Sequence, residues 1–141
     1  MSDLAKKLIS VACWVLAVVI IIVILPFGTI HNVEIDYGTT TKFEPREVKA
    51  AVRTVLLSFL LNIDCDLKEL SYDEERSRGF ANDYEISKYG EDNLIVVFGV
   101  YETGSGKNAT LRSNTLYPWC WVLARYGKGF GWMIIDTGFP C

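Results

Sequence analysis

The chain has 141 residues, a formal net charge of −3 and a hydrophobic content of 50%. This length fits one domain, and the acidic balance argues against nucleic acid as a partner, because nucleic acid attracts basic patches. His31 is the single histidine of the sequence, so a serine or cysteine catalytic triad is not expected. No metal-ligand spacing is recognisable, and we expect neither a metal nor a cofactor.

The segment 8–27, LISVACWVLAVVIIIVILPF, contains no charged side chain. A helix of this length rises about 30 Å, which matches the hydrocarbon thickness of a bilayer. A cleaved signal peptide fits less well, because no small-x-small cleavage site follows the segment. A lipoprotein signal ending at Cys13 would leave most of the apolar stretch behind the cysteine. The sequence therefore predicts an uncleaved transmembrane helix.

The charges beside this helix predict its orientation. Lys6 and Lys7 directly precede the apolar segment, and acidic residues follow it. The positive-inside rule then places residues 1–7 in the cytoplasm and residues 28–141 outside. We expect a single-pass protein of the cell membrane with an extracytoplasmic C-terminal part.

The outer part is expected to begin with a tether and a helix. Residues 28–44 are polar and rich in turn formers, and they predict a tether with a short strand at 33–35. The extracytoplasmic domain is expected at 45–141. Pro45 suits the first turn of a helix, and apolar residues then recur at helical spacing to about Asn62. The last turns of this helix are apolar almost all round, so the helix must be covered on more than one side.

The remainder of the domain is expected to form a sheet. Residues 64–72 alternate well enough for a strand, and S-x-x-E at 71–74 has the form of a capping box that starts a short helix or turn. Residues 94–101 are apolar on both faces, which indicates a central strand. Two more strands, at 116–126 and 131–137, close the chain. Hairpin-length connections predict an antiparallel sheet with the helix across one face, which is an α+β fold.

The most distinctive stretch is WCWVLARYGKGFGWMIID, near the C-terminus. With the hairpin turn centred on Lys128, Trp121 and Arg125 point to one face of the sheet, whereas Trp132 and Asp136 point to the other. Both faces are then largely apolar. One face can meet the helix, and the other needs the remaining segment, a second subunit or a ligand. We interpret the tryptophans first as core or interface residues.

Cysteine usage leaves the redox state open. Cys13 lies within the predicted span, and Cys65, Cys120 and Cys141 lie outside it. An odd number in an exported domain means at least one unpaired thiol or a link to another chain. One disulfide among these three residues and free buried thiols are both compatible with the sequence.

Three stretches of the outer part resemble a known family. They are CDLKELSYDEE at 65–75, YGEDNLIVVFGV at 89–100 and WCWVLARYGKGFGWMIIDTG at 119–138. Together they resemble the bacterial domain-of-unknown-function family 4829, whose members look like short exported or membrane-anchored proteins. This family is similar to the nuclear transport factor two-like, or cystatin-like, superfamily, so the resemblance implies a curved antiparallel sheet around a helix. It implies no activity, because fold does not decide function.

Two functions remain open at this point. The first is a non-catalytic module that binds a protein partner, a second copy of itself or a small ligand. The alternative is a small-molecule lyase or isomerase that uses an aspartate with a tyrosine in a closed pocket between helix and sheet. The candidate ligand-binding residues are Tyr72, Asp73, Tyr101, Trp121, Arg125, Trp132 and Asp136.

Overall fold

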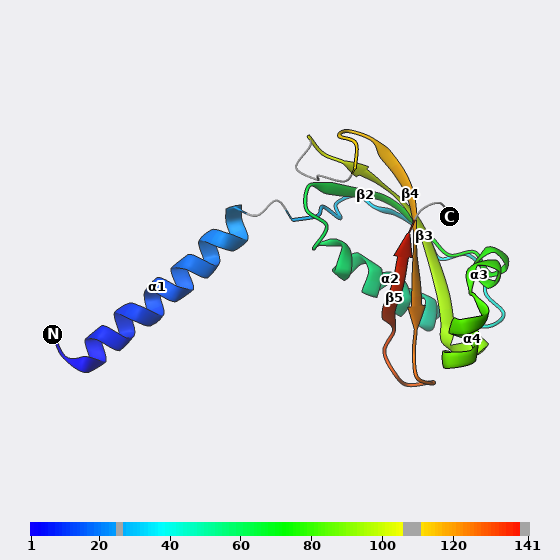
Figure 1. Ribbon diagram of the computed structural model, residues 1–141, viewed down its shortest axis with the longest axis horizontal. Coiled ribbons are helices and arrows are strands. Elements are labelled where there is room, and N and C mark those ends of the chain that lie inside the picture. Colours follow the sequence, from blue (N-terminus) through cyan, green and yellow to red (C-terminus); the bar gives the residue numbers. More distant parts are fainter. Residues whose placement is uncertain (25–26, 106–110, 139–141) are drawn as a thin grey trace.

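We describe the fold from a computed structural model, which describes residues 1–24, 27–105 and 111–138. A long N-terminal helix stands apart from an α+β domain (Figure 1). The domain contains a five-stranded sheet in the order β1-β2-β3-β4-β5. The elements are α1 (Asp3–Ile24), β1 (Glu34–Asp36), α2 (Pro45–Phe59), β2 (Cys65–Ser71), α3 (Glu74–Phe80), α4 (Asp83–Tyr89), a 3-10 turn (Glu91–Asn93), β3 (Leu94–Thr103), β4 (Leu116–Ala124) and β5 (Met133–Gly138).

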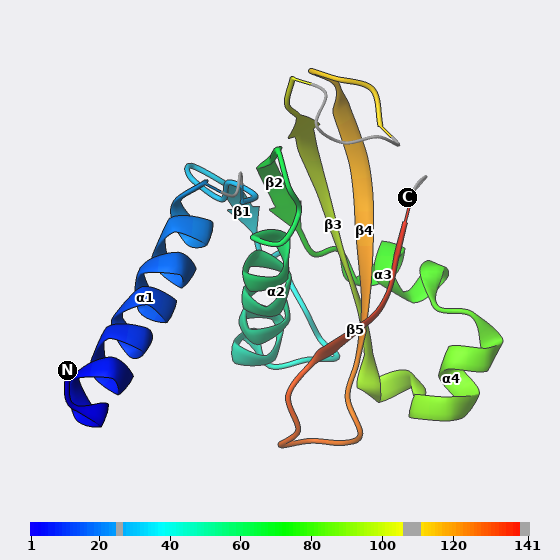
Figure 2. The same cartoon turned by 60° about the vertical axis from the view of Figure 1, so that its left-hand side comes forward.

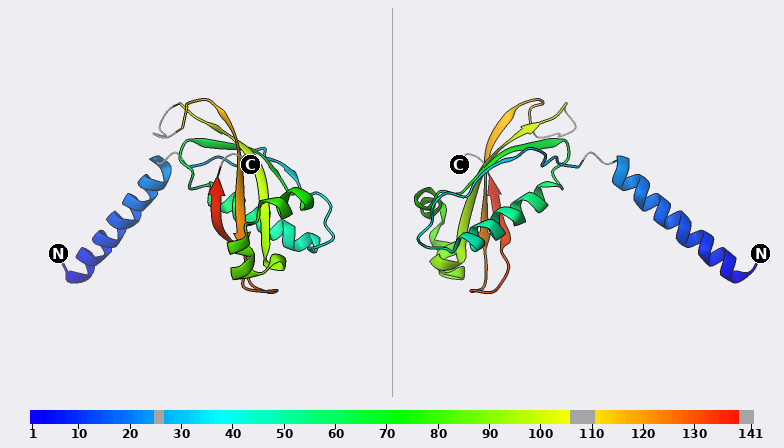
Figure 3. Two further views of the ribbon diagram at one scale, coloured as in Figure 1. Left: turned by 45° about the vertical axis from the view of Figure 1, so that its right-hand side comes forward. Right: turned by 180° about the vertical axis from the view of Figure 1, so that it is seen from behind.

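Helix α1 covers most of the apolar segment predicted to span a membrane. It has 22 residues, and none of them is buried. By length and composition the helix is a candidate membrane span. In both views of Figure 3 it extends away from the domain, so its apolar side chains are not part of the domain core.

Helix α2 confirms the predicted amphipathic helix, although it ends at Phe59 rather than near Asn62. Pro45 occupies its first turn, and the carboxylate of Glu47 accepts the backbone N–H of Glu44 at 2.7 Å. Both features favour a helix start, because they suit or satisfy backbone donors that lack partners within the helix. One face of the helix is buried against the sheet and consists of Val48, Ala51, Val52, Val55 and Phe59.

The two faces of the sheet are covered by different helices (Figure 2). Helix α2 packs on one face, where the largest core cluster includes Leu67, Ile95 and Leu123. Helices α3 and α4 lie over the other face, where a second cluster contains Leu94, Val96, Phe98, Cys120, Val122 and Ala124. The remaining segment of the chain therefore covers the face that the sequence left open.

The sheet is mixed rather than antiparallel throughout. Strand β1 pairs with β2 in parallel, whereas the other neighbouring strands are antiparallel. The short strand expected at 33–35 is thus present as β1, and it joins the segment to the sheet. The segment is bonded further through Thr29, whose N–H donates to Cys65 at 2.8 Å and whose carbonyl accepts from Leu67 at 2.9 Å. Phe43, in the same segment, is buried. Sequence alternation could not show this pairing, because β1 is only three residues long.

The β4–β5 hairpin differs from the expected register by one residue. Leu123 lies opposite Ile134, so the centre of the hairpin is displaced from Lys128. A one-residue shift moves side chains to the opposite face of a strand. Trp132 accordingly joins the cluster on the α2 face, not the opposite face. The pairing then slips at a bulge, and Asp136 lies opposite Val122, whose side chain belongs to the other face.

The polar segment after β2 forms two short helices where one short helix or turn was expected. The first begins at Glu74 and is capped by Asp73 rather than by Ser71, since the Asp73 carboxylate accepts the N–H of Arg76 at 2.7 Å. The second begins after Asn82, whose side chain accepts the N–H of Glu85 at 2.9 Å. These caps satisfy donors at the helix starts, and Ser77 of α3 accepts the N–H of Val96 of β3 at 2.9 Å.

Truncating the buried end of α2 should destabilise the domain strongly. Phe59 is fully buried, so we expect Phe59→Ala to lower the free energy of unfolding by about 3–5 kcal/mol. Arg53→Ala, at an exposed position of the same helix, should change it by no more than about 0.5 kcal/mol. Urea unfolding of the full chain in detergent micelles, followed by tryptophan fluorescence, measures both. Equal effects of the two substitutions would contradict the packing described above.

Candidate functional site

Arg125 is a buried arginine directly after β4, at the base of the β4–β5 hairpin. One guanidinium nitrogen donates to the carboxylate of Glu47 at 2.6 Å. Another donates to the carbonyl of Asp92 at 3.3 Å. The guanidinium also lies 4.5 Å from the ring centroid of Trp132, which adds a cation–π contact. Burial of this charge is thus compensated by a carboxylate, a carbonyl and an aromatic face.

Trp132 connects the same group of residues to the helix backbone. Its indole N–H donates to the carbonyl of Glu47 at 3.0 Å. Its ring meets the ring of Phe43 edge to face, with 5.7 Å between the centroids. Arg125, Glu47 and Trp132 therefore form one closed cluster, here called the arginine cluster, which joins the start of α2 to the hairpin.

The charge of Glu47 is maintained by this cluster. Partial burial opposes ionisation, but the hydrogen bond from Arg125 and the backbone N–H of Glu44 outweigh it and lower the pKa of Glu47 from its ordinary value of 4.5. Glu47 is therefore ionised at neutral pH, and the ion pair is intact. A carboxylate in this state serves as a partner for Arg125 and not as a general acid.

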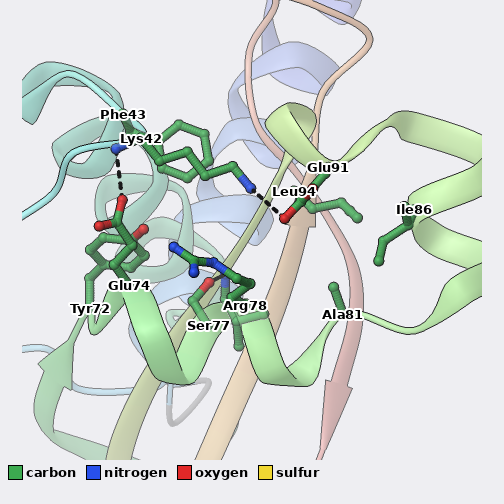
Figure 4. Close-up of a pocket in the computed structure, with 11 residues that line it drawn as sticks. Lys42, Phe43, Tyr72, Glu74, Ser77, Arg78, Ala81, Ile86, Glu91 and Leu94 are labelled. Atoms are coloured by element: carbon green, nitrogen blue, oxygen red, sulfur yellow. Dashed lines mark hydrogen bonds and ion pairs between the residues drawn. The ribbon is translucent and has the colours of Figure 1, made fainter.

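A small cavity lies beside the arginine cluster, between α3, the segment before α2 and the start of β3 (Figure 4). Its volume is about 20 Å³. This is enough for a water molecule but not for an organic ligand. Charged groups of both signs surround it, and the ammonium group of Lys42 lies 3.8 Å from the carboxylate of Glu91. The lining residues are Lys42, Phe43, Tyr72, Glu74, Ser77, Arg78, Ala81, Ile86, Glu91, Leu94 and Val96.

Glu74 has a role that the sequence did not indicate. The capping-box pattern assigned it only to a helix start, but its carboxylate accepts the backbone N–H groups of Lys42 at 2.7 Å and Thr41 at 3.1 Å. The hydroxyl of Thr41 donates to it as well, at 3.0 Å. The hydrogen bond from Lys42, together with those from Thr41, lowers the pKa of Glu74. Glu74 thereby fastens the segment before α2 to the start of α3, whereas its neighbour Glu75 is exposed.

The two candidate tyrosines lie in separate places. Tyr72 lines the small cavity, and burial raises its pKa to about 12. Tyr101 is packed against Phe59 and Trp119, with ring centroids 5.7 and 5.6 Å away, and burial raises its pKa to about 12 as well. Both phenols are protonated at neutral pH.

The candidate aspartates lie at the surface. Asp73 is exposed and caps α3. Asp136 is exposed on β5, and its carboxylate accepts the N–H of Thr137 at 2.9 Å. Trp121 is buried against Phe59 instead. Tyr72 and Asp73, which are neighbours in the chain, both line an open surface depression. Arg125 and Trp132 are in direct contact, and both are bonded to a residue that the sequence did not single out.

That residue is Glu47, and the sequence contains no signal for its partner. The position of Glu47 in the first turn of α2 indicates only a role in capping that helix. Its partner Arg125 lies 78 residues later in the chain, so no local pattern connects the two residues. Among the described residues, no group of three or more side chains suited to metal binding is formed.

The three cysteines outside α1 have different environments. The Cys65 thiol is buried and donates to the carbonyl of Ile63 at 3.5 Å. Cys120 is disulfide-bonded. Cys141 lies outside the described residues. An exported location is compatible with a disulfide, because disulfides persist in oxidising compartments.

Comparison of the chain with protein-family models, with curated proteins and with solved structures gives no match.

The arginine cluster is chemically closed, since the groups that could bind an anion or a base are bonded to one another. Its clearest consequence is mechanical: it fixes the hairpin on the start of α2. This placement determines which side chains of the hairpin reach solvent.

Breaking the buried ion pair should destabilise the domain in a pH-dependent way. Removal of one partner of a buried pair costs about 3–5 kcal/mol, and we expect Arg125→Met to fall near the lower end because Glu47 is partly exposed. The double variant Arg125→Met/Glu47→Leu should recover part of this loss. Because the pKa of Glu47 is lowered in the folded state, its contribution is present above about pH 4.5 and is lost as the pH falls through the folded pKa.

Urea unfolding of these variants between neutral and acidic pH provides the measurement. Glu47→Gln should lack the part of the acid-dependent loss that this carboxylate contributes. If Glu47→Gln and the unmodified chain lose stability in parallel throughout, the assigned pKa direction is wrong.

Loss of the Glu74 carboxylate should loosen the segment before α2. In Glu74→Gln, fewer donors can be satisfied, and amide hydrogen exchange at Thr41 and Lys42 should become severalfold faster. Glu75→Gln is the matched control, since this neighbour is exposed. Hydrogen exchange with mass spectrometry measures both variants, and unchanged exchange in Glu74→Gln would show that this contact does not hold the segment.

Proposed function

We propose that the protein is a single-pass, membrane-anchored extracytoplasmic domain that binds a partner protein through aromatic side chains of α4 and the β4–β5 hairpin. We call this surface the aromatic tip and define it by Tyr84, Tyr89, Tyr126 and Phe130. Tyr84, Tyr126 and Phe130 are 70%, 67% and 64% exposed. This exposure, at the hairpin that the arginine cluster fixes, is the observation that carries the proposal.

The tip brings two separate elements together. The rings of Tyr89 on α4 and Tyr126 on the hairpin lie 5.7 Å apart. The ammonium group of Lys88 lies 5.1 Å from the ring centroid of Tyr89. Single exposed apolar residues are common, but a group of tyrosine and phenylalanine side chains around a charged residue is typical of interaction sites.

The charges at the tip favour a particular kind of partner segment. Lys88 and Lys128 are both exposed, the second within the hairpin turn. A segment that combines an apolar side chain with a carboxylate would use both the rings and the ammonium groups. Because these charges are exposed, binding of the partner to the tip should weaken as the salt concentration rises.

Support for the anchor comes from α1 and its flank. The helix is long and apolar enough to span a bilayer, and Lys6 and Lys7 precede its apolar part. We propose that the amino end is cytoplasmic, as the positive-inside rule favours. The proposed kinship with family 4829 and the cystatin-like superfamily is supported by the single helix α2 across one face of a largely antiparallel sheet.

The lyase or isomerase alternative is not proposed. It required an aspartate next to a tyrosine in a closed pocket, and both Asp73 and Asp136 are exposed. Tyr72 lines a cavity of about 20 Å³, which is too small for an organic substrate, and the larger depression that it shares with Asp73 is open to solvent rather than closed.

Photo-crosslinking tests the proposed tip. With p-benzoylphenylalanine in place of Phe130, irradiation of cells that produce the full chain should give a discrete protein adduct. The same reagent at Leu116, which is 59% exposed at the other end of β4, should not give that adduct. Adding Lys88→Glu should reduce the yield at position 130, because the partner segment is expected to carry a carboxylate.

The outcomes separate the parts of the proposal. An adduct of twice the chain mass would identify a second copy as the partner, and no adduct at position 130 would refute the tip. Alkaline carbonate extraction tests the anchor independently: the full chain should remain with the membranes. Recovery in the soluble fraction, in a form that begins after Phe27, would refute the anchor.

A further inference from the structure

The domain is fastened to its own core almost directly after α1. The N–H of Gly28 donates to the carbonyl of Leu60 at 3.0 Å, and the N–H of Thr29 donates to the carbonyl of Cys65 at 2.8 Å. Gly28 is tightly enclosed there, since an added Cβ would lie 2.2 Å from the carbonyl oxygen of Phe59. Among the described residues after α1, Gly28 is thus bonded to the C-terminal end of α2.

This attachment limits how far the domain can stand from a bilayer that α1 spans. Helix α1 ends at Ile24, so only residues 25–27 separate it from Gly28. Four Cα–Cα steps reach at most about 14 Å. The headgroup layer on each side of the hydrocarbon core is itself about 5–7 Å thick. The C-terminal end of α2 must then lie in the headgroup layer or within about 7–9 Å of it.

Large apolar side chains are exposed at this same end. Leu57 and Leu61, near the end of α2, are 61% and 75% exposed. Ile63, in the following turn, is 47% exposed, and Phe27, just before Gly28, is 40% exposed. We call these four residues the apolar rim. They contrast with Val48, Ala51, Val52, Val55 and Phe59 of α2, which are buried against the sheet.

We propose that the apolar rim inserts into the headgroup–acyl boundary of the same bilayer that α1 spans, so that the domain rests on the membrane by the C-terminal end of α2. This inference rests on the proposed membrane anchor. The occupant is lipid because the short connection keeps the rim at the bilayer surface. Apolar side chains at that depth are stabilised by leaving water, as in interfacial helices.

The charges near the rim indicate which lipids are needed. Asp64, Asp66 and Glu102 lie around the neighbouring surface depression, and Lys68 is paired with Asp66 and Glu102 at 2.5 and 3.5 Å. Such a surface does not attract anionic headgroups. Contact should therefore form on phosphatidylcholine alone and should not strengthen when anionic lipid is added.

Contact of the C-terminal end of α2 with the bilayer would also set the orientation of the aromatic tip. The arginine cluster holds the hairpin at the start of α2, whereas the rim lies at its end. Helix α2 has 15 residues and is thus about 22 Å long. The aromatic tip and the apolar rim are accordingly at opposite ends of this helix, and insertion of one leaves the other in water.

Thiol labelling of the full chain in nanodiscs tests the inference. In a Cys13→Ala background, Leu61→Cys places a thiol in the rim, and Tyr84→Cys is the matched control at the tip because Tyr84 is 70% exposed. The discs contain phosphatidylcholine and one chain each. A water-soluble maleimide should react with Leu61→Cys about tenfold or more slowly than with Tyr84→Cys, because the reactive thiolate requires water. The two rates should become similar in urea and detergent.

A second substitution and the number of chains per disc distinguish insertion into lipid from other causes of protection. Adding Leu57→Asp should restore most of the labelling at position 61, because a carboxylate opposes insertion. Equal rates for the two thiols in nanodiscs, or no effect of Leu57→Asp, would overturn insertion of the rim. Protection seen only when discs hold two chains would identify a second copy as the occupant and would also overturn it. Failure of the chain to enter nanodiscs or to resist carbonate extraction would instead contradict the anchor itself.

Discussion

The structure depends on one constraint, which is that the central strands are apolar on both faces. Nearly every residue of β3 is buried, and so is the C-terminal half of β4. A sheet of this kind is stable only when both faces are covered, because exposed apolar area of this extent is unfavourable in water. Helix α2 covers one face and helices α3 and α4 cover the other, so the chain satisfies the requirement without a second subunit or a ligand.

This coverage changes where a function can be sought. Trp121 and Trp132 are buried in the core, and Arg125 contacts Glu47, Asp92 and Trp132. Polar groups bonded in this way support a rigid arrangement more readily than chemistry on a ligand. The exposed apolar side chains of the domain are therefore the informative ones, and the groups at the aromatic tip and at the apolar rim include its most exposed members.

With the proposed membrane anchor, the two proposed surfaces complement each other. The rim lies beside Gly28, a few residues after α1, and the tip lies at the other end of α2. The hydrogen bonds of Glu74 to Thr41 and Lys42 and the arginine cluster hold the start of α2 in place. A domain braced in this way could present the tip in a constant direction, which would reduce the entropic cost of binding a partner.

The sequence by itself determined the features that arise from local patterns. These are the apolar N-terminal helix, the amphipathic α2 with Pro45 at its start, the central strand β3 and the closing hairpin. Only the tertiary structure decided the parallel pairing of β1, the register that moves Trp132 to the α2 face, and the contacts of Glu47 and Glu74. The physical reason is that periodicity records which side of an element is apolar, whereas strand partners and ion pairs join residues that lie far apart in the chain.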